Sequence, residues 1–184
     1  MRKSLGVSLA MALLMSMVAI GAGPASAAGG TTCTKLVGVV GTITPGLPPL
    51  SSSALVTKVV TKASGSFAGC TGGGVTAGKF SLASTPSKTP GNCKTLLQPD
   101  KSGPTAGTGS ITWTPKGSST FSFKLLKTTP PSTSQVFSAK ITGGLFKGLT
   151  ATQKFTFTAV PKTGCVSTPL SKVTVAPKTP LVIK

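Results

Sequence analysis

Four cysteines are the residues of this chain whose type and spacing most directly indicate chemistry: Cys33, Cys70, Cys93 and Cys165. No two of them have the short C-x₂₋₄-C spacing that is typical of a zinc site. The chain also lacks histidine, so we expect no metal site and no cofactor. An even number of cysteines in an exported chain indicates disulfide bonds. The sequence therefore predicts two disulfides.

The residue combinations used by common hydrolases are missing. The chain has no histidine, and Asp100 is its one acidic residue. A Ser-His-Asp triad needs an imidazole base, and glycoside hydrolysis usually needs two carboxyl groups. A serine and lysine at S-x-x-K spacing on a helix would remain, but Ser84–Lys88 and Ser138–Lys140 do not have that spacing. We expect no enzymatic activity.

Lysine dominates the charged residues. The whole chain has 19 basic residues against Asp100, and removal of a segment containing Arg2 and Lys3 leaves 17 lysines and a net charge of +16. These lysines are dispersed from Lys35 to Lys184. Such a surface attracts polyanions over about 8–10 Å in physiological salt. Specific nucleic-acid recognition is not expected, because arginine usually makes the bidentate contacts and the remaining chain has none.

The first 27 residues have the features of a secretory signal peptide. Arg2 and Lys3 are followed by the apolar run Leu5–Ile20 and by the small residues Ala25–Ala27, which suit cleavage by a signal peptidase. The apolar run is shorter than the roughly 20 residues of a spanning helix, and no later segment is long and apolar enough. We predict a secreted protein with a single β domain at 28–184 and no transmembrane segment.

Alternating polarity predicts an all-β domain. In Phe121–Leu125 and Lys154–Ala159 the apolar and polar residues alternate, as in strands with one buried face. These segments, with Ile111 and Trp113, form the predicted core. The predicted strands are 34–44, 54–62, 64–69, 75–84, 110–114, 120–127, 135–142, 154–160 and 172–176, and the predicted loops are 86–104 and 128–134. An antiparallel β-sandwich is expected, with a β-barrel as the alternative, because the sequence does not show whether the sheet edges close.

The chain resembles small secreted proteins of high-GC Gram-positive bacteria to which no activity is assigned. The resemblance rests on the signal peptide, on short motifs and on cysteine positions. The motifs are Phe67–Cys70, Gly109–Trp113 and Gly143–Gly148, and the cysteine positions are Cys33 and Cys93. This resemblance implies an extracellular β-sandwich and supplies no catalytic or binding residues.

Hairpin geometry ranks the three ways of pairing four cysteines. If Thr34–Thr44 pairs antiparallel with a return path over Ala54–Gly69, Cys33 and Cys70 lie at the same end of the hairpin, within bonding reach. Cys93 in a loop is then left to meet Cys165. The predicted return path is longer than the outgoing strand, so a bulge is expected at Gly65. Cys33–Cys165 with Cys70–Cys93 is the alternative pairing.

Two functions remain compatible with this sequence. The first is a non-catalytic secreted or cell-envelope-associated protein that binds anionic cell-wall polymers through its dispersed lysines. The second is a passive structural or adhesive module with a protein partner, in which the charge serves solubility. The sequence indicates neither a binding face nor an oligomeric state.

Overall fold

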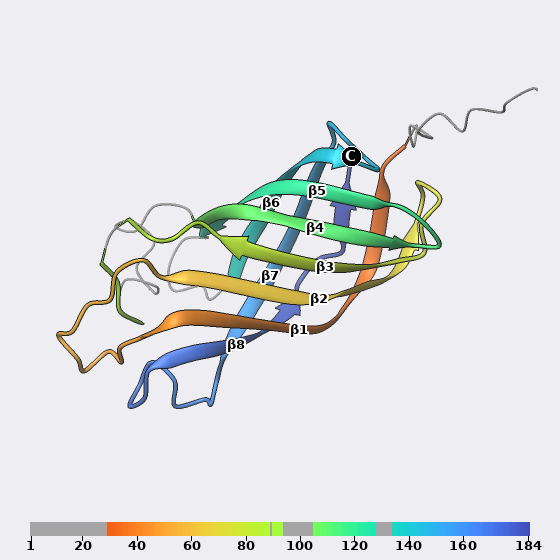
Figure 1. The fold of residues 1–184 in the computed structure, drawn as a ribbon. Coiled ribbons are helices and arrows are strands. Elements are labelled where there is room, and N and C mark those ends of the chain that lie inside the picture. The colour runs from red at the N-terminus through yellow and green to blue at the C-terminus, as the bar shows by residue number, and fades with distance from the viewer. Residues whose placement is uncertain (1–28, 89, 94–104, 128–133) are drawn as a thin grey trace, which may run out of the picture.

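The chain forms an antiparallel β-barrel in a computed structural model that describes residues 29–88, 90–93, 105–127 and 134–184 (Figure 1). The strands are β1 (Thr31–Leu47), β2 (Val60–Thr71), β3 (Ala77–Ser84), β4 (Thr105–Thr114), β5 (Ser118–Lys127), β6 (Ser134–Gly144), β7 (Thr150–Val160), β8 (Leu170–Pro177) and β9 (Leu181–Ile183). Each strand from β1 to β8 pairs with the next, and β8 pairs with β1. The sheet is thereby closed.

The strands form because inward and outward positions differ in polarity. On β5 the side chains of Phe121 and Phe123 are buried inside the barrel, whereas Ser122 and Lys124 are exposed on its outer wall. Residues two apart share a face of a strand, so this period places the aromatic rings in one core. Ile111 joins them from β4.

β8 and β9 share one position in the barrel. β8 pairs with the Val40–Leu47 part of β1, and β9 pairs with Thr31–Cys33 at the start of the same strand. Both also pair with β7. Pro180 lies in the break between them, where a residue without an N–H donor does not interrupt a ladder. β9 was not among the predicted strands.

The all-β prediction is confirmed, and of the two architectures left open the structure has the barrel. β1 is 17 residues long, which lets it pair with β2 on one side and with β8 and β9 on the other. A sandwich would leave these strand edges unpaired. Closure removes the exposed edges instead.

The β1–β2 hairpin differs from the prediction in two details. Residues 54–59 form no strand, apart from an isolated bridge between Val56 and Gly91. The register shift lies at Gly65 as predicted, between the pairs Val37–Ser66 and Val40–Ser64, but the extra residue is on β1 and not on the return strand β2. At Gly65 a Cβ would lie 2.6 Å from a side-chain methyl of Val39.

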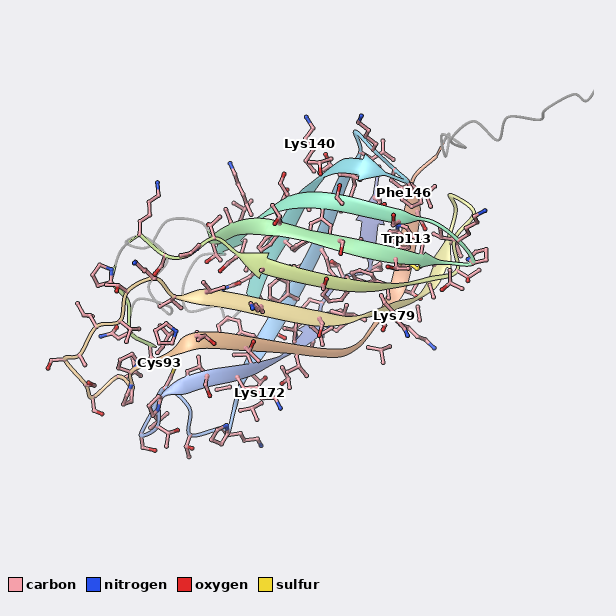
Figure 2. All side chains as sticks on the ribbon, in the orientation of Figure 1. Lys79, Cys93, Trp113, Lys140, Phe146 and Lys172 are labelled. Atoms are coloured by element: carbon pink, nitrogen blue, oxygen red, sulfur yellow. A yellow bond between two sulfur atoms is a disulfide. The ribbon has the colours of Figure 1, made fainter. Side chains whose placement is uncertain are left out.

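One end of the barrel is filled by an aromatic pair. Trp113 and Phe146 meet edge to face with ring centroids 5.4 Å apart, and Figure 2 labels both at the same end of the barrel. The Trp113 indole N–H donates to Ser119 Oγ over 2.9 Å, and the Ser119 hydroxyl donates to the Leu145 carbonyl. This plug closes the end at which β4 meets β5.

Several predictions concern residues that the structure does not describe. The predicted signal peptide, residues 1–27, lies outside the described residues. So do 89 and 94–104 of the first predicted loop and 128–133 of the second. No helix in the described ranges is long and apolar enough to cross a bilayer.

Candidate functional site

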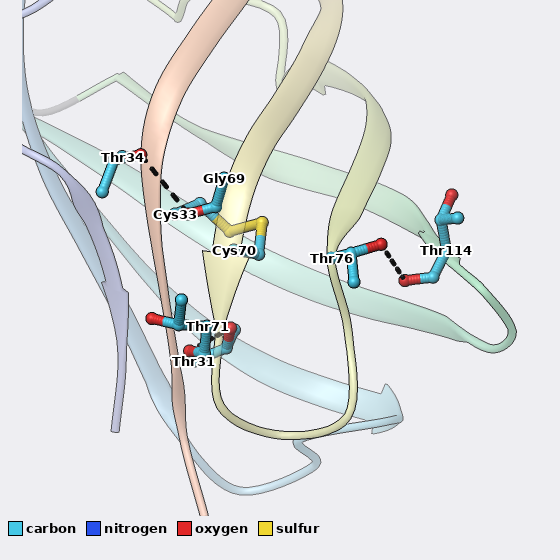
Figure 3. The surroundings of a disulfide bond; sticks show 8 residues. All are labelled: Thr31, Cys33, Thr34, Gly69, Cys70, Thr71, Thr76 and Thr114. Carbon is cyan, nitrogen blue, oxygen red and sulfur yellow. Dashed lines mark hydrogen bonds between the residues drawn. A yellow bond between two sulfur atoms is a disulfide. The ribbon is translucent and has the colours of Figure 1, made fainter.

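The four cysteines form two disulfides, Cys33–Cys70 and Cys93–Cys165. This is the pairing that the hairpin argument ranked first, and the register places Cys33 directly opposite Cys70. Around the first bond the Thr34 hydroxyl donates to the Gly69 carbonyl (Figure 3). In the described ranges no group of three or more metal-ligating side chains lies together.

The second disulfide fastens the opposite part of the molecule. Cys93 and Cys165 are 72 residues apart in sequence and tie the segment after β3 to the connection between β7 and β8. Cys93 is fully buried in a second apolar cluster with Leu47 and Leu170. Both disulfides thus stabilise the fold and leave the outer wall as a candidate binding surface.

Every lysine whose side chain the structure describes is exposed. They are Lys35, Lys58, Lys62, Lys79, Lys88, Lys116, Lys124, Lys140, Lys147, Lys154, Lys162, Lys172, Lys178 and Lys184. Figure 2 shows Lys140 extending away from the barrel. Aspartate and glutamate are absent from the described residues, so no carboxylate side chain there compensates these charges.

Strand register brings two of these lysines to the same place. Lys62 on β2 and Lys172 on β8 are both the registered partners of Thr42 on β1. Neighbouring strands lie 4.7–4.9 Å apart, so the two lysine backbones are separated by about 10 Å. That is close to the Debye length in physiological salt, about 8–10 Å. The two ammonium groups therefore present a joint positive potential.

A row of small hydroxyl side chains crosses the outer wall beside these lysines. Ser64, Ser81, Ser110 and Thr120 are successive registered partners on β2, β3, β4 and β5. The Ser81 and Ser110 hydroxyls are 3.4 Å apart, and the Thr120 hydroxyl lies 3.1 Å from that of Thr142. Because these side chains are short, the row does not project from the wall.

The row lies in an open groove of about 670 Å³ on the outer wall. We call it the hydroxyl groove, and its outward-facing lining is Val40, Thr42, Lys62, Ser64, Ser81, Ala83, Thr108, Ser110, Thr120 and Thr142. Hydroxyls both donate and accept hydrogen bonds, and Lys62 adds a cation at one side. The surface is suited to oxygen-rich, negatively charged ligands.

The dispersed lysines were predictable from the sequence, whereas this groove was not. Lys62 and Lys172 are 110 positions apart in the sequence. They become neighbours of the same residue, Thr42, only because β8 pairs with β1. A signal for the hydroxyl row was present, since Ser64, Ser81 and Ser110 all alternate with inward-facing residues. Their alignment depends on register, which the pattern of one strand does not contain.

The chain matches no protein-family model, no curated protein and no solved structure. Its resemblance to small secreted bacterial proteins therefore stays a prediction. Function is inferred below from the geometry and charge of the chain itself.

Proposed function

We propose that this is a non-catalytic secreted or cell-envelope-associated protein that binds anionic cell-wall polymers on the outer wall of its barrel. The observation that carries the proposal is the placement of Lys62 and Lys172 on either side of Thr42. The described part of the chain supplies no carboxylate side chain to neutralise them. A polymer phosphate or carboxylate would do so.

Repeated weak contacts account for the binding better than one strong contact. A single exposed ion pair contributes about 0.2–1 kcal/mol, which is too little to hold a ligand alone. A polymer that carries one charge on each repeat unit can meet several lysines at once, and each later contact is then effectively intramolecular. Dispersed lysines suit a long, flexible polyanion for this reason.

The hydroxyl groove favours polymers that also carry neutral oxygens. Phosphodiester polymers with sugar or polyol units provide charges for Lys62 and hydrogen-bonding groups for Ser81 and Ser110. Cross-strand neighbours repeat every 4.7–4.9 Å, so a chain lying across the strands meets a hydroxyl at each step. We infer that the groove orients the polymer, while the lysines supply most of the attraction.

A structural or adhesive module with a protein partner is the second candidate. Leu50 and Val166 favour it, because these apolar side chains are 45% and 64% exposed. The Leu50 N–H donates to the carbonyl of Cys165 over 2.8 Å. Leu50 therefore lies near Val166, which follows Cys165 in the sequence. A protein interface is usually marked by an apolar patch larger than a few hundred Å². The other large apolar side chains that are exposed in the described residues are Val37 on β1, Leu55 between β1 and β2, and Leu126 on β5.

Retention on purified cell wall tests the proposal. The mature protein is loaded at low ionic strength and eluted with a sodium chloride gradient, with wall stripped of its anionic polymers as the control. Charge-driven binding predicts strong retention that falls steeply as salt rises, and little retention on stripped wall. Equal retention on both walls, or retention that salt does not change, would reject polymer binding.

A further inference from the structure

The barrel interior also contains a cavity of about 150 Å³ that is partly open to solvent. Its walls are formed by inward-facing side chains of β1 to β9, and most of them are apolar. Rings of Phe67, Phe80, Phe121, Phe123, Phe137, Phe155 and Phe157 line it. An eight-stranded barrel is just wide enough either for its side chains to fill it or for one small ligand to remain inside. The cavity shows that packing is incomplete here.

The polar lining of the cavity includes residues near one end of the barrel. Thr105 begins β4, Gln135 is the second residue of β6, and both line the cavity. Thr61, the second residue of β2, lines it as well. The opposite end holds the Trp113–Phe146 plug. The cavity is thus apolar in its depth and has hydrogen-bonding groups on one side.

Gln135 is the polar residue of the lining that is best suited to hydrogen-bond a ligand. The residue is 9% exposed and lines the cavity, and in the described residues no fully buried side-chain nitrogen or oxygen lacks a hydrogen-bond partner. Gln153, the other buried glutamine of the lining, donates to the Thr179 carbonyl over 3.2 Å. The Gln135 amide has both donor and acceptor atoms, and it lies at the edge of an otherwise mainly apolar lining, where a ligand with one polar group could bind it.

We propose that the cavity binds one small, uncharged, mainly apolar molecule with a single hydroxyl or carbonyl group that hydrogen-bonds to Gln135. An apolar cavity of about 150 Å³ has room for a benzene-sized molecule. None of the described residues that line this cavity is charged, so a charged ligand would lose its hydration without compensation from them. A monocyclic aromatic alcohol has the appropriate size and polarity.

This site is separate from the outer wall. Residues alternate between the two faces of a strand, so Ala63 lines the cavity while Lys62 is exposed outside. Ligand binding inside and polymer binding outside can therefore be tested independently. A variant that no longer binds the internal ligand can still bind the polymer, and the reverse also holds.

Phenol and toluene are suitable probes, with benzoate as a charged control. Calorimetry on the mature protein should detect binding of phenol and toluene, and both should raise the melting temperature as ligands of the native state do. Benzoate should have no effect. Absence of binding by both neutral probes would overturn the proposal.

Three variants locate the site. Gln135→Leu should weaken phenol binding about two- to tenfold, the value of one neutral hydrogen bond, and leave toluene binding unchanged. Ala139→Leu should fill the cavity and abolish both. Ser138→Leu, whose side chain is absent from the cavity lining, is the matched control and should bind as the wild type does.

Each alternative outcome contradicts a stated part of the proposal. Equal phenol affinity in Gln135→Leu would remove Gln135 from the site, and unchanged binding in Ala139→Leu would place the probes elsewhere. Should Ala139→Leu fail to fold, chemical-shift changes at the methyl groups of Ile141 and Leu125 in the wild type give the second measurement. Both residues line the cavity, so their methyl signals must shift on binding, and shifts confined to exposed residues would overturn it.

Discussion

Lys62 and Lys172 lie opposite the same residue, Thr42, from the two strands that flank β1. Both side chains are exposed, and their backbones are about 10 Å apart. The two ammonium groups repel each other, and an anion bound near both would offset this repulsion. The pair is therefore a specific location at which an anionic ligand should be attracted.

Removal of this pair should weaken polymer binding more than removal of two other lysines. We expect Lys62→Ala/Lys172→Ala to elute from cell wall at clearly lower salt than the wild type, because two cooperating contacts are lost. Lys116→Ala/Lys147→Ala has the same net charge and is the matched control. The control variant should elute at only slightly lower salt than the wild type, because it loses two charges from the overall attraction to the polymer but keeps the Lys62–Lys172 pair.

The comparison between these two double variants separates location from total charge. Equal elution of both would show that only net charge matters, and the Lys62–Lys172 pair would then have no special role. Circular dichroism should be unchanged in both, since all four lysines are exposed.

Ser119 should contribute to stability through the plug. Its hydroxyl accepts from the Trp113 indole N–H and donates to the Leu145 carbonyl. Ser119→Ala leaves the buried Trp113 N–H and the half-buried Leu145 carbonyl without this partner, so the free energy of unfolding should fall by about 1–3 kcal/mol. Urea denaturation measures this. Ser118→Ala, at an exposed neighbouring position, should change it by no more than about 0.5 kcal/mol, and equal effects would contradict the described plug.

The Cys93–Cys165 disulfide should be a major source of stability. Its residues are 72 apart in sequence, and the chain-entropy relation gives about 4 kcal/mol for a loop of that length. Cys93→Ala/Cys165→Ala should lower the free energy of unfolding by an amount of this order. Peptide mapping without reduction provides the direct check on pairing, and a recovered peptide joining Cys70 to Cys93 would contradict the structure.

The exposed apolar pair near this disulfide distinguishes the two candidate functions. Leu50→Ser/Val166→Ser should leave retention on cell wall unchanged, because neither side chain carries charge. A large loss of retention in this variant, with the lysine variants unaffected, would favour the protein-partner alternative.

Local patterns predicted the strands well because alternation is a property of each strand alone. Phe121 and Phe123 are buried as expected, and Ile111 and Trp113 lie in the same core. β9 was missed because three residues after Pro180 are too few to show a period. Its place in the barrel depends on pairing with β1, at the other end of the sequence.

Barrel closure and the Lys62–Lys172 pair depend on pairing between strands that are far apart in the sequence, which the residue pattern of a single strand does not show. Whether β8 meets β1 distinguishes a barrel from a sandwich, and the same pairing brings Lys172 to Lys62. For the internal cavity a sequence signal did exist. Gln135 is a polar residue in phase with the inward-facing Phe137 and Ala139, and a polar residue in an apolar series is a reason to look for a partner.

The most direct test of the central claim is the affinity of the mature protein for a soluble phosphodiester polymer, such as poly(glycerol phosphate), as a function of salt. The logarithm of the binding constant should fall linearly with the logarithm of salt concentration, as counterion release requires for polyanions such as DNA. The slope should be shallower for Lys62→Ala/Lys172→Ala, and a neutral dextran should not bind. A slope near zero, or equal affinity for dextran, would contradict a charge-driven polymer-binding function.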